Sequence, residues 1–334
     1  MAAPILEVQG LSVTFATHAG PVTAVQDVSF ALAPGETLAL VGESGSGKSV
    51  TSLALLRLTP PAPRTRLGGA AILRAGDGRA VDLLTLPERG MQELRGNQIA
   101  MIFQEPMTSL NPVQRIGDQI AEAILTHRAV GRREALQRAA SLLARVGIPD
   151  ASRRLSAYPH QLSGGMRQRV MIAMALSCDP AVLVADEPTT ALDVTVQAQI
   201  LELLLDLQRE SGMAILFITH NLGVVAEIAD RVMVMYAGRI VECGDVVPVM
   251  TSPRMPYTQG LLRAVPSLEI GDRFVPLTSI PGTVPSPAAL PQGCCFAPRC
   301  RFALPQPCTQ SVPPLQEAEP GHSVRCARWR ECAA

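Results

Sequence analysis

The segment Gly42–Ser49 combines the residue types of a phosphate-binding loop at the required spacing. Two glycines are separated by four residues and followed by lysine and serine, in the order Gly42, Glu43, Ser44, Gly45, Ser46, Gly47, Lys48, Ser49. Glycines let backbone N–H groups face an anion, the Lys48 ammonium neutralises outer phosphates, and the Ser49 hydroxyl binds Mg²⁺. The spacing predicts a nucleoside triphosphate site with Mg²⁺, and the alternative is a chance Gly/Ser turn before a helix.

A second candidate site is the acidic end of the apolar stretch Val182–Glu187. In a fold with a phosphate loop, such a strand end manages the metal and the attacking water. We expect Asp186 to act on Mg²⁺ through the Ser49 shell and Glu187 to polarise the water as general base. An ordinary strand followed by an acidic helix cap is the alternative.

The periodicity of the chain predicts the elements that position these residues. The apolar strand Thr37–Val41 enters the loop, and the helix Ser49–Leu58 leaves it. Later alternation of helices and strands predicts a mainly parallel sheet with helices on both faces, an α/β fold. The segments are helix Gly165–Ser177, strand Ala181–Ala185, helix Thr195–Ser211, strand Met213–Thr219, helix Leu222–Ala229 and strand Arg231–Tyr236.

Two further regions lie outside this alternation. Short β-rich runs before the loop predict a sheet, at Leu11–Phe15, Val22–Val25 and Val28–Leu32. Residues 113–148 carry helical periodicity in two pieces, Ile116–Leu125 and Glu134–Val146. The second region therefore predicts an all-helical insertion.

Composition narrows the class of protein. The 334 residues are 47% hydrophobic, which is enough for a substantial core, and 29 basic side chains balance 29 acidic ones. No net field would hold the chain on nucleic acid or on an anionic membrane. No window reaches the roughly 18 apolar residues of a membrane span, and Met1–Val8 lacks a signal-peptide pattern, so we expect a cytoplasmic chain.

The composition shifts toward proline near Thr251, which predicts a separate and irregular C-terminal appendage. Six of the eight cysteines crowd into its end, namely Cys294, Cys295, Cys300, Cys308, Cys326 and Cys332. Clustered cysteines in a cytosolic chain indicate metal binding before disulfides.

Between the two candidate sites, Leu162–Arg169 reads LSGGMRQR and resembles the signature motif of the ATP-binding-cassette (ABC) ATPases. Met166 stands where the family usually has Gln, a departure that looks like the peptide-importer branch. The resemblance implies that Ser163, Gly164 and Gly165 open a helix whose positive end completes the ATP site of a second subunit.

Other family landmarks follow in order. The resemblance implies that Gln104 senses Mg²⁺ and the attacking water, that Asp193 in Ala191-Leu192-Asp193 lies at the dimer contact, and that His220 contacts the γ-phosphate. By its position in the first sheet, Phe15 is the aromatic residue best placed to stack on adenine. Cofactor ATP with Mg²⁺ and catalytic roles for Glu187, His220 and Gln104 are thereby expected.

The family resemblance also implies the architecture. It is a P-loop NTPase core with an N-terminal antiparallel β subdomain, an α-helical subdomain at about residues 105–178, and an irregular Cys-rich C-terminal extension. The expected domains are the ABC ATPase at 1–250 and the peptide-importer extension at 251–334.

The segments Glu105–Pro112 and Gln161–Leu176 look like ATPases of dipeptide and oligopeptide importers, with nickel importers as close relatives. The expected function is therefore to energise a peptide or nickel importer from the cytoplasmic face of the bacterial inner membrane. Expected partners are an identical or paralogous ATPase, two permease subunits that dock on the helical insertion, and indirectly an extracytoplasmic substrate-binding protein.

The tail pattern Gly293–Cys300 resembles the extension of these subunits, some of which carry a [4Fe–4S] cluster. Alignment on that pattern selects Cys294, Cys300, Cys308 and Cys326 as ligands and leaves Cys295 and Cys332 spare. Four thiolates suit iron–sulfur or zinc, and the wide spacing favours the cluster. Cys178 and Cys243 are expected to be buried small hydrophobes.

Two rival classes are weaker. A cassette ATPase acting on DNA or ribosomes usually has tandem cassettes or a long coiled coil, whereas this chain has one phosphate loop and no sustained heptads. A protein that binds ATP without turnover would lack Glu187 or His220, and both are present.

Overall fold

The computed structural model describes residues 3–74, 78–105, 109–190, 192–265 and 279–332. The chain divides into two compact units, which are described separately. The first unit contains Met1–Glu7, Ala31–Glu36 and Ala71–Ile218, and the second contains Val8–Phe30, Thr37–Ala70 and Thr219–Ala334.

A parallel sheet forms the centre of the first unit. Strand β7 (Val182–Asp186) pairs on one side with β6 (Ile99–Ile102) and on the other with β8 (Ala214–Thr219), and every residue of the three strands is buried. Continuous apolar strands of this kind are expected where helices cover both faces of a sheet. Both predicted strands of this region are confirmed, each beginning one residue later than predicted.

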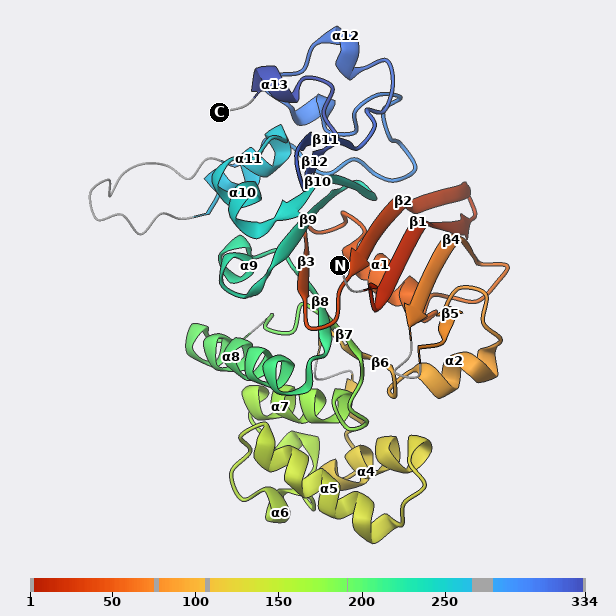
Figure 1. Cartoon of the computed structure of the whole chain (residues 1–334), viewed down its shortest axis with the longest axis vertical. Helices are drawn as coiled ribbons and strands as arrows, with labels where there is room; N and C mark the ends of the chain where they lie inside the picture. The colour runs from red at the N-terminus through yellow and green to blue at the C-terminus, as the bar shows by residue number, and fades with distance from the viewer. Residues whose placement is uncertain (1–2, 75–77, 106–108, 191, 266–278, 333–334) are drawn as a thin grey trace, which may run out of the picture. The chain divides into compact units, whose positions relative to one another are not determined.

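Helices make up most of the remaining first unit (Figure 1). In the insertion, α4 (Ile116–His127) and α5 (Arg132–Arg145) pack on each other and on α7 (Gly164–Ala175), with the short α6 (Ala151–Arg154) against α5. Their buried apolar side chains recur at helical spacing, so the predicted helices are confirmed. The other elements are β5 (Ala80–Asp82), α2 (Glu88–Leu94), the 3₁₀ turn η1 (Pro159–Gln161) and α8 (Val194–Ser211).

The second unit contains most of three long N-terminal strands, β1 (Leu6–Thr17), β2 (Gly20–Leu32) and β4 (Thr65–Arg74). The prediction of two separate strands at 22–32 is wrong, because β2 continues through both. Asp27 has φ 53, and its N–H donates to the Ser12 hydroxyl at 3.1 Å. This cross-strand bond holds the irregular residue within the sheet.

This unit also contains β3 (Thr37–Val41), which lies parallel to β9 (Arg231–Tyr236). Strand β10 (Arg239–Asp245) pairs antiparallel with β9 and is followed in the sheet by β12 (His322–Val324) and β11 (Gln316–Glu319). The last two strands belong to the proline-rich tail and were not predicted. The tail therefore extends the sheet edge.

Helices of the second unit are short. They are α1 (Lys48–Leu55), α9 (Leu222–Ile228), α10 (Val246–Thr251), α11 (Pro256–Arg263), α12 (Pro305–Cys308) and α13 (Trp329–Cys332), with the 3₁₀ turn η2 (Ala297–Arg299). Across the described part of the chain, no helix combines the length and apolar character needed to cross a membrane.

Candidate nucleotide site

The phosphate loop joins β3 to α1, and its glycines occupy positions that other residues could not. Gly42 has φ 156, and a Cβ there would lie 2.2 Å from the Met235 carbonyl oxygen. Gly47 has φ 109 and precedes the first residue of α1, which begins without a side-chain cap. The N–H groups of the first helical turn are thus not bound by a capping side chain, as an anion site requires.

Polar groups of the loop fit a phosphate. Lys48 is 5% exposed, and its ammonium donates to the carbonyl oxygens of Gly42 at 2.7 Å and Glu43 at 3.0 Å. The Ser46 hydroxyl is buried and has no hydrogen-bond partner among the described residues. A phosphate oxygen would satisfy this hydroxyl, and Ser49, half-buried in the first turn of α1, carries the oxygen ligand that Mg²⁺ prefers.

At the acidic end of strand β7 in the first unit, the predicted residues Glu187 and Gln104 are in contact. Asp186 ends β7 and is 3% exposed. Glu187 follows at φ 47, and its Oε2 accepts from the Gln104 amide at 3.2 Å and from the Thr190 hydroxyl at 2.9 Å. Sequence reasoning missed Thr190, although the Pro-Thr-Thr turn directly after the carboxylates is a signal for it. The left-handed backbone at a non-glycine residue is a strain typical of functional sites.

The signature segment contains the N-terminus of helix α7, which is accessible at Gly164. Ser163 caps α7 by accepting the Met166 N–H at 3.3 Å. A Cβ at Gly164 would meet nothing within 4 Å, whereas one at Gly165 would lie 2.9 Å from a methyl of Val196. The first turn of α7 is therefore accessible at Gly164 and closely packed at Gly165.

Asp193 also caps a helix, because its carboxylate accepts the Val196 N–H at 2.9 Å at the start of α8. The next residue, Val194, is 83% exposed, an unusual position for a large apolar side chain. His220 is exposed directly after β8, and Phe15 is half-buried in β1. Residues Pro106, Met107, Thr108 and Ala191 of the predicted motifs lie outside the described residues.

The predicted metal site in the tail is wrong. Within the described residues, no group of three or more His, Cys, Asp or Glu side chains could hold a metal ion. This finding overturns the iron–sulfur and metal-binding expectations for Cys294, Cys300, Cys308 and Cys326, as well as the zinc alternative. These cysteines line one small pocket with Cys332, and burial raises the pKa of Cys294 to about 11 and of Cys326 to about 12.

The other cysteines are free thiols too. Cys178 is 1% exposed, which confirms that it is a buried small residue, while Cys243 is half-buried. Cys295 belongs to the apolar cluster of the second unit.

Comparison with known proteins agrees with this geometry. The family described as ABC transporter matches residues 25–190, and the family described as oligopeptide/dipeptide transporter, C-terminal region, matches residues 241–308. The chain is 59% identical to a putative peptide import ATP-binding protein of Brucella melitensis biotype 1, over 99% of each chain. It is 52% identical to another such putative protein of Brucella suis biovar 1, over 97% of this chain and 95% of the relative.

A solved structure of the dimeric ATP-binding cassette MJ0796, bound to ADP and Pi, is similar with a TM-score of 0.62 at 26% identity. The likeness covers 72% of this chain and 98% of that chain. The fold and site thus define an ATP-binding-cassette ATPase, and the expected ATPase fold is confirmed. More specifically, this chain belongs to the ABC transporter family, with the C-terminal region of its oligopeptide/dipeptide transporters.

Proposed function

We propose that this chain is the ATP-hydrolysing subunit of an importer for dipeptides or oligopeptides. The ATPase activity is inferred from the family membership. The peptide assignment is supported by the match of residues 241–308 to the oligopeptide/dipeptide transporter C-terminal region and by the names of the relatives. Its cassette occupies residues 1–250, with the helical subdomain at about 105–178, and the extension occupies 251–334.

The phosphate loop is the observation that carries the proposal. Its buried Lys48 and the partnerless hydroxyl of Ser46 bind phosphate oxygens, and the first turn of α1 adds backbone N–H donors. The Ser49 hydroxyl and the Asp186 carboxylate would hold Mg²⁺. A bound Mg²⁺ supplies positive charge that stabilises the phosphate oxygens in the transition state.

Glu187 acts as the general base for the attacking water. The Gln104 amide and the Thr190 hydroxyl donate to this carboxylate and orient it. His220 contacts the γ-phosphate, and Phe15 stacks on the adenine.

Two cassettes work head to tail, so the open end of α7 at Ser163–Gly165 completes the ATP site of a second, identical or paralogous ATPase. The MJ0796 cassette is itself described as dimeric. Asp193 and the exposed Val194 lie at this dimer contact. The chain is peripheral at the cytoplasmic membrane face.

Two permease subunits dock on the helical insertion. In the first unit, Val113 is 80% exposed, and Leu125 is 37% exposed on α4. Exposed large apolar side chains of this kind provide surface for a partner helix. An extracytoplasmic binding protein delivers the substrate to the permeases.

The test is transport in liposomes that contain the chain, its partner ATPase and both permeases, with ATP enclosed on the side of the ATPases and the substrate-binding protein added on the other side. We expect ATP-dependent uptake of a labelled dipeptide or of a labelled oligopeptide, and none with Lys48→Ala. Uptake of labelled Ni²⁺ without peptide uptake would reject the peptide assignment, and uptake without ATP hydrolysis would reject the whole proposal.

A further inference from the structure

Glu43, the second residue of the phosphate loop, is bound by an arginine from the far end of the chain. Arg299 Nη1 donates to Oε2 of Glu43 at 2.7 Å, and Arg299 Nη2 donates to Oε1 of the same carboxylate at 3.0 Å. The arginine side chain is 5% exposed and the glutamate side chain 30%. Such a two-bond pair fixes orientation as well as charge, so the Glu43 side chain is held in one direction.

The backbone of Glu43 is bound as well. Its N–H donates to the Tyr257 hydroxyl at 2.9 Å, and its carbonyl accepts from the Lys48 ammonium at 3.0 Å. Burial raises the pKa of Tyr257 well above its usual value, so the hydroxyl stays neutral. The Glu43 carbonyl also accepts from the Ser46 N–H at 3.2 Å. Every polar group of Glu43 therefore has a partner, and two of the four partner residues, Tyr257 and Arg299, belong to the C-terminal extension.

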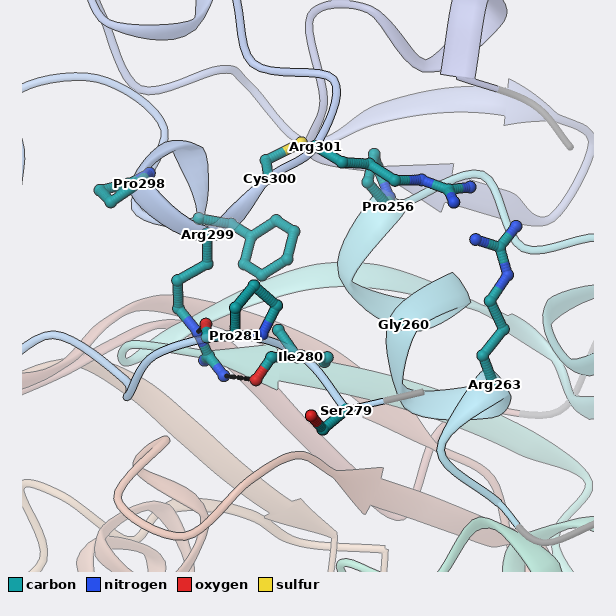
Figure 2. Close-up of a pocket in the computed structure, with 11 residues that line it drawn as sticks. Pro256, Gly260, Arg263, Ser279, Ile280, Pro281, Pro298, Arg299, Cys300 and Arg301 are labelled. Atoms are coloured by element: carbon teal, nitrogen blue, oxygen red, sulfur yellow. Dashed lines mark hydrogen bonds between the residues drawn. The ribbon is translucent and has the colours of Figure 1, made fainter. Parts of the chain in front are cut away.

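The Arg299 guanidinium is also held by hydrogen bonds to backbone carbonyl oxygens of the tail. Its Nε donates to the Pro281 carbonyl oxygen at 2.8 Å, and Nη2 donates to those of Ile280 at 3.4 Å and Gly282 at 3.2 Å. Figure 2 shows the guanidinium beside the backbone of Ile280 and Pro281, at the wall of a cavity of about 340 Å³. Since these carbonyls surround it, the guanidinium cannot shift without moving the tail backbone.

Three aromatic rings pack at this contact. The centroids of Tyr236 and Tyr257 lie 4.6 Å apart, and Phe296 lies 5.3 Å from each of them. Packing of this kind limits side-chain movement. The extension is therefore a rigid support where it meets the loop.

We propose that Arg299 and Tyr257 are positioning residues for ATP binding, which act by holding Glu43 and thereby the shape of the phosphate loop. Neither residue needs to touch the nucleotide. Glu43 lies between Gly42 and the rest of the loop, and its carbonyl shares the Lys48 ammonium with that of Gly42. Preorganised donors bind an anion more tightly than donors that must first be ordered.

The test is a titration of the full-length chain with a fluorescent ATP analogue. Arg299→Ala should raise the Kd about tenfold, and Tyr257→Phe about threefold, because each removes hydrogen bonds to Glu43. Arg299→Lys keeps the charge but not the paired geometry, so it should give an intermediate Kd. In a double-mutant cycle, Arg299→Ala should add little to Glu43→Gln.

Arg325 provides a matched control. It is 8% exposed and donates to the carbonyl oxygens of Ile240 and Pro313, and neither of these two residues belongs to the phosphate loop. Arg325→Ala should lower the thermal midpoint without nucleotide while leaving the Kd within about twofold.

Two results would overturn the proposal: an unchanged Kd in the folded Arg299→Lys and Tyr257→Phe variants, or an equal rise in Arg325→Ala. The proposal rests on ATP binding at this loop. A wild-type chain that does not bind the analogue would refute the proposed function itself, whereas normal wild-type binding with unaffected variants refutes only the positioning role.

Discussion

Glu187, directly after β7 in the first unit, and Glu242, within β10 of the second, are two carboxylates with opposite surroundings. Glu187 is half-buried, has a left-handed backbone, and accepts from a neutral amide and a neutral hydroxyl. Glu242 is 0% exposed in β10 and accepts the N–H groups of Arg254 at 2.5 Å and Met255 at 3.2 Å. It also bonds to His322 Nε2, in the tail strand β12, at 2.8 Å.

Under the proposed function, this difference separates a carboxylate that acts as the general base from one that stabilises the fold. A general base needs an accessible oxygen, so its partners must leave one available, and backbone strain is tolerated at such sites. A buried carboxylate must instead have all its acceptors satisfied. Glu242 thereby joins the tail to the central sheet of the second unit.

Replacement of Glu187, the proposed general base, tests the comparison most strongly. Glu187→Gln should lower kcat for ATP on the order of 10²–10⁴-fold, because the amide cannot take a proton from water. Nucleotide affinity should persist. Phosphate release measures the first quantity and equilibrium binding the second, with exposed Glu202→Gln on α8 as control. A loss below about tenfold would show that Glu187 is not the base.

Replacement of the structural carboxylate should act on stability instead. Glu242→Ala leaves two backbone N–H groups and His322 without their acceptor, so the free energy of unfolding should fall by about 3 kcal/mol. Urea denaturation at constant pH measures it. A change under about 1 kcal/mol would remove the contrast with Glu187.

The thiols of the tail allow the effect of burial on an ionisable side chain to be tested by changing the pH. Burial raises the pKa of Cys294 from 9.0 to about 11, so at pH 8 its thiolate fraction is about a hundredfold below that of an unperturbed thiol. Alkylation by iodoacetamide should be slower by at least that factor and should accelerate as pH rises toward 11.

Peptide mapping by mass spectrometry gives the rate at Cys294, and the same chain in urea provides the reference. The raised pKa also means that stability is fully present below about pH 9 and declines as pH rises through 11. Equal labelling of native and unfolded chains at pH 8 would contradict burial of this thiol.

The smallest effect should come from a residue that only orients the base. Thr190→Val removes the hydroxyl that donates to Glu187 and keeps the shape, so kcat should fall about threefold to tenfold with little change in KM. Steady-state kinetics separate the two parameters. A loss as large as that of Glu187→Gln would instead assign Thr190 a direct role in the chemistry.

Much of the fold could be predicted because its signals are local. Helices α4, α5 and α8 follow from apolar periodicity, and β7 and β8 from short apolar runs. The tail strands could not, because Gln316–Glu319 and His322–Val324 have no alternating apolar pattern and owe their structure to pairing with β10. The cysteine spacing misled for a related reason, since spacing does not report whether the side chains come together as a group that could hold a metal ion.

By itself, the sequence determined the phosphate loop, the acidic strand end and the signature helix, because each depends on neighbours within a few residues. Only the tertiary structure decided that Thr190 would hold Glu187 and that Arg299 would bind Glu43 across 256 positions of chain. A loop's glycines set its own backbone, but the partners of its side chains come from packing between distant segments, which residue spacing does not encode.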